Sequence, residues 1–186
     1  MEKRELVERA QRGDHDAFAA LTRATVARAD AAARLILRDA QSAEDAVQDA
    51  YVRAWRDLRG LRDPDRFDAW LHRLLVNACR DQLRRRRRRV IEVEMSELVE
   101  PEAPDPFARG LARDEMERAF RRLSADQRAV IVLHYYLDLP LPEAAPLLGI
   151  PLGTAKSRLH RAVQAMKSAL ERDASPADRP AEGPVP

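Results

Sequence analysis

Apolar residues recur at spacings of three and four along nearly the whole chain, and this periodicity limits the possible folds more than any other feature. Such spacing places side chains on one face of an α-helix, whereas a half-buried strand needs strict alternation. Strand-like alternation is absent, and only 6 of the 186 residues are glycine. The sequence therefore predicts an all-α protein.

One segment interrupts the helical pattern. The stretch VEPEAPDPFARG, residues 99–110, contains three prolines, a glycine and three acids, and such a composition cannot bury enough apolar surface to fold. We therefore predict two small helical domains, residues 1–89 and 112–172, joined by a flexible acidic linker over residues 90–111. The proline-rich segment 173–186 is predicted to be a disordered tail.

Capping signals divide the two domains into helices. Asp14 is placed to begin the second helix, and Ser42 is predicted to be the N-cap of the third. A long helix then runs into six consecutive arginines, residues 84–89. SADQ, residues 124–127, has the pattern of a capping box for the second of four helices in the C-terminal domain.

The last predicted helix, residues 151–171, follows a short helix and the turn GIPLG, which is the layout of a helix-turn-helix motif. Its apolar residues form one stripe at spacings of three and four: Leu152, Ala155, Leu159, Val163, Met166 and Leu170. The side chains off this stripe are polar or basic and can contact phosphates or base edges: Thr154, Lys156, Ser157, Arg158, His160, Arg161, Gln164 and Lys167. Periodicity alone leaves a solvent-exposed amphipathic helix equally open, and the turn favours DNA binding.

Two helices of the N-terminal domain carry polar faces. On the long helix, one face carries Asn77, Arg80, Asp81 and Arg84, of which Asn and Arg can hydrogen-bond base edges. On the helix after Ser42, a mostly acidic face carries Glu44, Asp45, Gln48, Asp49 and Tyr51. The acidic face is either a protein-binding surface or an ordinary solvent-exposed one. Phe67 and Trp70 could stack on unpaired bases, but we interpret them as core residues.

No pattern indicates an enzyme. A P-loop, a dinucleotide-binding turn and a nucleophile elbow are absent, so we expect no catalytic residues and no cofactor. His72 and Cys79 share one helix without further ligands nearby, so no metal site is expected. The single cysteine, the charged N-terminus and the lack of a long apolar run predict a cytoplasmic protein.

Three blocks, in this order and spacing, resemble a bacterial RNA polymerase sigma factor of the extracytoplasmic function (ECF) group. SAEDAVQDAYVRAW, residues 42–55, resembles the helix that grips the clamp of core RNA polymerase. FDAWLHRLLVNACRDQLRRRRR, residues 67–88, resembles the helix that reads and melts the promoter −10 element. Residues 123–162 resemble the helix-turn-helix domain that reads the −35 element. The resemblance covers nearly the whole chain except the tail.

The resemblance implies a transcription initiation factor with two partners, core RNA polymerase and promoter DNA. Such factors are commonly held by an anti-sigma factor, which would be a third partner. The residues implied to bind polymerase are Glu44, Asp45, Gln48 and Asp49. Those implied to contact the −10 element are Asn77, Arg80, Asp81 and Arg84, and those implied for the −35 element are Thr154, Lys156, Ser157, Arg158 and Arg161. The loop from Leu58 to Arg66 is similar to one that pockets a flipped base.

Two alternatives belong to other classes. One is a helix-turn-helix transcriptional regulator whose N-terminal domain binds some other protein, and the other is an inactive or inhibitor-bound relative. A plain regulator has no need of residues 42–55 and 67–84, which favours the initiation factor.

The block at residues 140–149, PLPEAAPLLG, departs from the family pattern. Pro146 falls near the centre of its helix, where proline removes a hydrogen bond at a cost of about 3 kcal/mol. The sequence therefore predicts a kinked or partly 3₁₀ helix here, which weakens the −35 assignment.

Overall fold

The computed structural model describes residues 2–93 and 111–173, and every regular element within these ranges is helical. This confirms the predicted all-α class. The α-helices are α1 (Lys3–Gln11), α2 (His15–Leu37), α3 (Ala40–Asp57), α4 (Phe67–Val93), α5 (Leu111–Arg121), α6 (Ala125–Ile131), α7 (Leu141–Leu148) and α8 (Leu152–Asp173). Two short 3₁₀ turns, η1 (Leu58–Gly60) and η2 (Pro64–Arg66), and a π segment, η3 (Val132–Tyr136), complete them. Most of the predicted linker and nearly all of the predicted tail lie outside the described residues.

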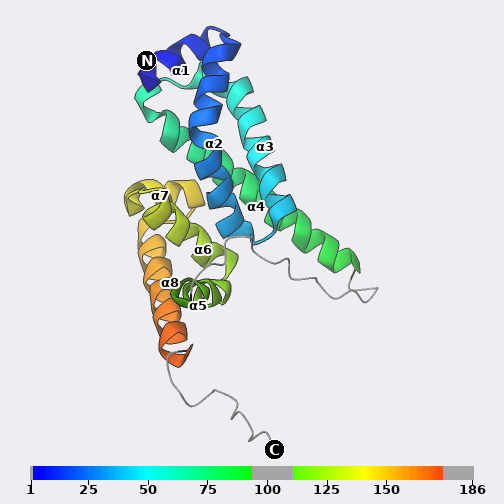
Figure 1. Cartoon of the computed structure of the whole chain (residues 1–186), viewed down its shortest axis with the longest axis vertical. Coiled ribbons are helices and arrows are strands. Elements are labelled where there is room, and N and C mark those ends of the chain that lie inside the picture. The colour runs from blue at the N-terminus through cyan, green and yellow to red at the C-terminus, as the bar shows by residue number, and fades with distance from the viewer. Residues whose placement is uncertain (1, 94–110, 174–186) are drawn as a thin grey trace, which may run out of the picture.

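The helices form two groups, α1–α4 and α5–α8, which pack against each other along the second half of α2 and the middle of α4 (Figure 1). Within the first group, α3 turns an alanine-rich face inward, and its buried residues are Ala43, Ala46, Val47, Ala50 and Ala54. One apolar cluster lies around Val7, Leu58 and Phe67. A second cluster continues from Ile36 and Leu75 into the C-terminal group. The two helix groups therefore share part of one core.

The start of α3 differs from the prediction. Asp39, not Ser42, is the N-cap, and its Oδ1 accepts a hydrogen bond from the backbone N–H of Ser42 at 2.6 Å. The predicted N-cap was wrong because Ser42 already lies within the first turn, where the earlier carboxylate satisfies its N–H. The other two predicted caps are confirmed: Asp14 caps α2, and Ser124 with Gln127 forms a capping box on α6.

Replacing Asp39 with alanine is expected to lower the free energy of unfolding by about 1 kcal/mol at neutral pH. Hydrogen bonds from the side chain and the backbone N–H of Ser42 lower the pKa of the Asp39 carboxyl. A carboxyl whose pKa is lower in the folded state stabilises the protein above its unfolded pKa and loses this effect as the pH falls through the folded pKa. Urea unfolding should therefore show the difference between variant and wild type shrinking toward zero in acid. A difference independent of pH would contradict the capping role.

Pro146 does not interrupt its helix. The chain is α-helical at every residue of α7, so the prediction of a partly 3₁₀ segment was wrong. In a helix of 8 residues, few N–H groups have intrahelical partners, so proline near the end removes only one such bond. Gly149 then closes α7 with a φ of 63°, which favours glycine. Irregular geometry occurs instead at η3, where Leu137 N–H donates to Val132 O at 2.9 Å.

Candidate functional site

The polar residues predicted on α3 lie along its outer side, opposite the buried alanines. Glu44, Asp45 and Gln48 are exposed, and Asp49 is half-buried. Arg34 on α2 pairs with Glu44 at 3.1 Å, and Arg53 lies 3.9 Å from Asp49. These cations neutralise the acidic face only in part, so it suits a basic surface of a partner protein.

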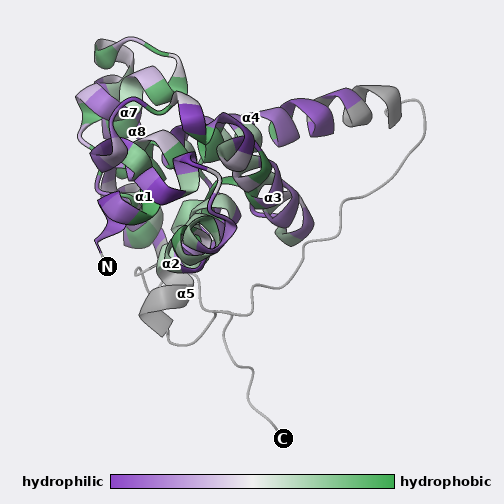
Figure 2. Cartoon of the chain, turned by 90° about the horizontal axis from the view of Figure 1, so that it is seen from above, coloured by the Kyte–Doolittle hydropathy of each residue, from purple (hydrophilic) through white to green (hydrophobic). Residues whose placement is uncertain are grey.

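The residues predicted to contact the −10 element lie together on one face of α4. Asn77, Arg80 and Asp81 are half-buried, and Arg84 is exposed. Asp81 accepts hydrogen bonds from both Arg53, at 3.0 Å, and Arg84. Because two guanidinium groups already occupy its carboxylate, Asp81 orients these arginines. Figure 2 shows the far part of α4 extending beyond the other helices, with hydrophilic residues along it.

Arg53 was missing from the predicted set. It connects Asp49 on the acidic face of α3 to Asp81 on α4, so charges on the two predicted surfaces interact through one side chain. The sequence did contain one signal for the contact with Asp49, because residues four positions apart meet on one face of a helix.

The residues predicted to contact the −35 element lie on the first three turns of α8. Lys156, Ser157 and Arg161 are exposed, and Thr154 and Arg158 are half-buried. Arg158 pairs with Asp126 on α6 at 3.4 Å. The predicted apolar stripe was wrong in two places, because Leu152 and Val163 are exposed, and α8 buries Ala162 as well as the predicted Ala155 and Leu159.

The faces of α4 and α8 meet at a small cavity between the two helix groups. Its lining includes Arg80 and Cys79 from α4 and Asp126 and Arg158 from the C-terminal group. A Cβ atom added to Gly149 would lie 3.3 Å from Nη1 of Arg80, so this guanidinium is packed against the turn before α8. The volume of about 70 Å³ is far below the several hundred Å³ of a typical ligand site.

Two arginines donate hydrogen bonds to backbone carbonyls across the boundary between the two helix groups. Arg128 on α6 is buried, and it donates to the carbonyl of Ile36 at 2.9 Å and to that of Leu123 at 2.6 Å. Arg38, at the end of α2, donates to the carbonyl of Arg121 at the end of α5, at 3.3 Å. Carbonyls in the last turn of a helix have no intrahelical donor, so each group caps a helix end of the other.

Neither arginine was identified from the sequence, because nothing local distinguishes them among the many arginines of the chain. Burial lowers the pKa of the Arg128 guanidinium to about 10, and the nearby charges of Arg38 and Arg86 act in the same direction. Arg128 is therefore still protonated at neutral pH. A third bridge lies at the surface, where Arg28 on α2 donates to the carbonyl of Tyr136 and to Asp138, both at 2.7 Å.

Cys79 is a buried free cysteine on α4. Burial raises the pKa of the Cys79 thiol to about 12, so it stays protonated at neutral pH. No group of three or more potential metal-binding side chains occurs within residues 2–93 and 111–173, and no helix described there is long and apolar enough to cross a membrane.

His72 makes stability depend on pH. Its Nδ1 atom is buried without a hydrogen-bond partner in the described part of the chain. Burial lowers the pKa of the imidazole, Asp68 opposes this effect, and the charges of Arg28 and Lys3 reinforce it. Because the unfolded chain then takes up the proton first, stability falls as the pH drops below the unfolded pKa. Thermal unfolding should show His72→Phe losing less stability than the wild type between pH 7.5 and pH 5, and equal losses would contradict this prediction.

Comparisons with known proteins match both helix groups. Residues 21–89 match the family model "Sigma-70 region 2", and residues 113–166 match "Sigma-70, region 4". The chain is 31% identical to the RNA polymerase sigma-H factor of Pseudomonas aeruginosa, over 90% of this chain and 93% of that protein. It is 36% identical to the ECF RNA polymerase sigma factor SigM of Mycobacterium tuberculosis, over 81% of this chain and 75% of that protein.

Two solved structures are also similar to this chain. CnrH in complex with the cytosolic domain of CnrY has a TM-score of 0.64 and 29% identity, covering 92% of this chain and 99% of that chain. RpoE of Bartonella quintana, in complex with the anti-sigma factor NepR, has a TM-score of 0.69 and 28% identity, covering 87% of this chain and 98% of that chain.

Proposed function

The chain belongs to the ECF family of RNA polymerase sigma factors, and we propose that it directs core RNA polymerase to promoters through the three surfaces described above. It is a transcription initiation factor whose partners are core RNA polymerase and promoter DNA. We further propose that it carries out no covalent chemistry of its own and acts in the cytoplasm, where polymerase and promoters are found. An anti-sigma factor is a further partner, as in the similar RpoE structure.

One observation carries this proposal. The region 2 and region 4 matches occur in one chain in the family order, and each contains a surface of suitable chemistry. The acidic face of α3 would bind polymerase through Glu44, Asp45, Gln48 and Asp49. The −10 strand would contact Asn77, Arg80 and Arg84, with Asp81 orienting the arginines. Thr154, Lys156, Ser157, Arg158 and Arg161 would enter the −35 major groove. The functional domains would be residues 1–89 and 112–172.

Reading both promoter elements at once requires the two helix groups to separate. DNA rises 3.4 Å per base pair, so elements centred 10 and 35 base pairs upstream lie roughly 85 Å apart along straight B-DNA. In the structure Arg80 and Arg158 line a single cavity. We therefore propose that the described arrangement is closed and that it opens when the factor binds polymerase and promoter DNA.

Gel filtration with bacterial core polymerase tests the first contact. The wild type should co-elute with the polymerase, and Asp45→Arg should weaken this binding about tenfold or more, because the reversed charge would face a basic partner surface. Glu5→Arg, a charge reversal at an exposed position of α1, serves as the matched control and should bind as the wild type does. Failure of the wild type to bind core polymerase would overturn the proposed function.

A further inference from the structure

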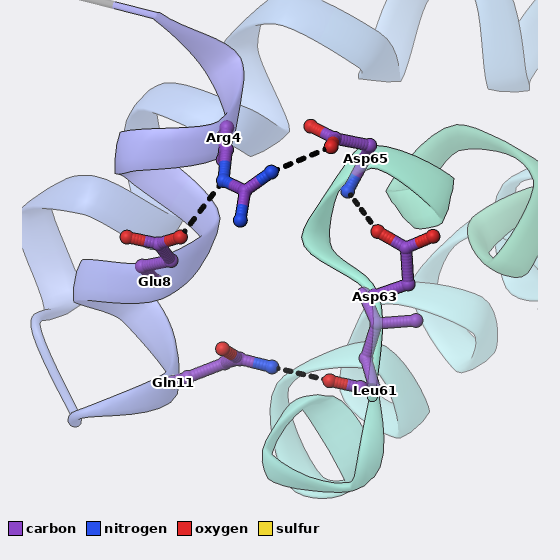
Figure 3. Close-up of polar contacts among 6 residues, drawn as sticks. All are labelled: Arg4, Glu8, Gln11, Leu61, Asp63 and Asp65. Atoms are coloured by element: carbon purple, nitrogen blue, oxygen red, sulfur yellow. Dashed lines mark hydrogen bonds and ion pairs between the residues drawn. The ribbon is translucent and has the colours of Figure 1, made fainter.

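We infer that α1 positions the loop 58–66 for promoter recognition, and that Gln11 is its main positioning residue. This inference rests on the proposed function, in which the loop receives a flipped base of the −10 strand. Helix α1 lies outside the region 2 match, which begins at residue 21, so the match gives α1 no role. Figure 3 draws the contacts of Gln11 with Leu61 and of Arg4 with Asp65.

Gln11 holds the first half of the loop through its backbone. Its Nε2 donates to the carbonyl of Leu61 at 2.7 Å and to that of Leu58 at 3.2 Å, and both bonds are partly buried. A carboxamide carries two N–H donors, so one side chain can serve both carbonyls. Since Leu61 N–H also donates to Leu58 O at 3.0 Å, Gln11 fastens both ends of the turn η1.

Charged side chains hold the second half of the loop. Arg4 donates to Asp65 at 2.7 Å, and Asp65 N–H donates in turn to Asp63 at 3.1 Å (Figure 3). Just beyond the loop, Lys3 pairs with Asp68 at 2.6 Å. These ion pairs are exposed, and such pairs contribute little stability individually. Their effect is to add two points of attachment along the chain after the one made by Gln11.

Apolar contacts fix the same helix behind the loop. Val7 and Ala10 of α1 are buried in one cluster with Leu58 and Phe67, the residues that begin and follow the loop. Both ends of the loop are therefore anchored in a core that α1 helps to build. A short loop held this way loses little conformational entropy on binding.

The loop directs its cations to the solvent. Arg59, Arg62 and Arg66 are exposed, while Leu58 and Leu61 lie against the cluster that contains α1. Three guanidinium groups on a fixed backbone suit an unstacked strand, since arginine binds phosphate and stacks on bases. A recognition pocket must hold its geometry within about 0.5 Å, so loosening the backbone at Leu58 and Leu61 should reduce base selectivity before it abolishes binding.

The test compares promoters with single-base changes across the −10 element, transcribed by the complete complex of core polymerase and this chain. Gln11→Ala should lower the preference for the best base about tenfold at one or two −10 positions, with −35 preference and polymerase binding unchanged. Gln11→Glu should lower it further, because a carboxylate would face two carbonyl oxygens. Glu5→Ala, on the same helix, is the matched control and should keep wild-type selectivity.

A second measurement does not depend on transcription. Amide hydrogen exchange in the free protein should become faster between residues 59 and 63 in Gln11→Ala than in the wild type, with unchanged exchange in α3 and the first half of α4. If the wild type initiates and both Gln11 variants keep its −10 selectivity, the role of α1 is overturned while the proposed function stands. Equal loss of activity on every promoter would also overturn it, because that result indicates damage to the fold. A wild type that fails to initiate overturns the proposed function itself.

Discussion

Replacing Arg80 with glutamate is expected to lower promoter-dependent transcription by about a hundredfold. Losing one good arginine contact to a base costs about 1–3 kcal/mol, and each 1.4 kcal/mol corresponds to a factor of ten. The new carboxylate would also repel the phosphates of the −10 strand, which adds to the loss. Arg80 is half-buried on the face of α4 that carries Asn77 and Arg84. Multiple-round transcription from a cognate promoter measures the effect.

The control for this variant is Arg23→Glu, which makes the same charge reversal at an exposed position of α2. It should retain transcription within a few-fold of the wild type. Both variants should bind core polymerase normally, since neither changes the acidic face of α3. Full transcription by Arg80→Glu would contradict the assignment of α4 to the −10 element.

Replacing Arg128 with alanine is expected to open the closed arrangement. The variant loses the charge-assisted hydrogen bond to Ile36 O, which crosses the boundary between the helix groups. Such bonds contribute about 1.5–3 kcal/mol, so the equilibrium should shift toward the open form by a factor of about 10 to 100. Energy transfer between dyes on Val52→Cys and Met116→Cys, two exposed positions on α3 and α5, should fall accordingly.

Two further variants separate opening from local damage, because Arg128 also donates to Leu123 within its own group. Arg28→Ala removes two hydrogen bonds that cross the boundary, and it should open the protein less because Arg28 is exposed. Arg172→Ala, on the exposed end of α8, should not change the transfer. Unchanged transfer in Arg128→Ala would contradict the closed arrangement described above.

Local signals in the sequence predicted the elements well. Helical spacing identified an all-α chain, and short capping patterns correctly placed Asp14 and the Ser124–Gln127 box, because these interactions join residues three positions apart. The same logic failed at Ser42, where a second capping residue stood only three positions earlier. At Pro146 the prediction used the free-energy cost of proline in the interior of a long helix, but α7 has only 8 residues and therefore little interior.

The relations between distant residues could not be predicted in this way. Arg128 meets Ile36 across 92 positions of sequence, and Gln11 meets Leu61 across 50. Neither side chain has a local pattern that distinguishes it from other polar residues on a helix surface. Asp81 shows the same limit, because Arg84 was predicted on its face while Arg53, 28 positions earlier on another helix, was visible as a partner only in the fold.

Run-off transcription on a genomic fragment library shows whether the chain directs initiation at specific promoters. The purified chain is added to bacterial core polymerase, and the 5′ ends of the transcripts are sequenced. We expect discrete start sites that share one −10 and one −35 motif and that disappear when the chain is omitted. Transcripts without shared motifs, or no transcripts together with no binding to core polymerase, would contradict it.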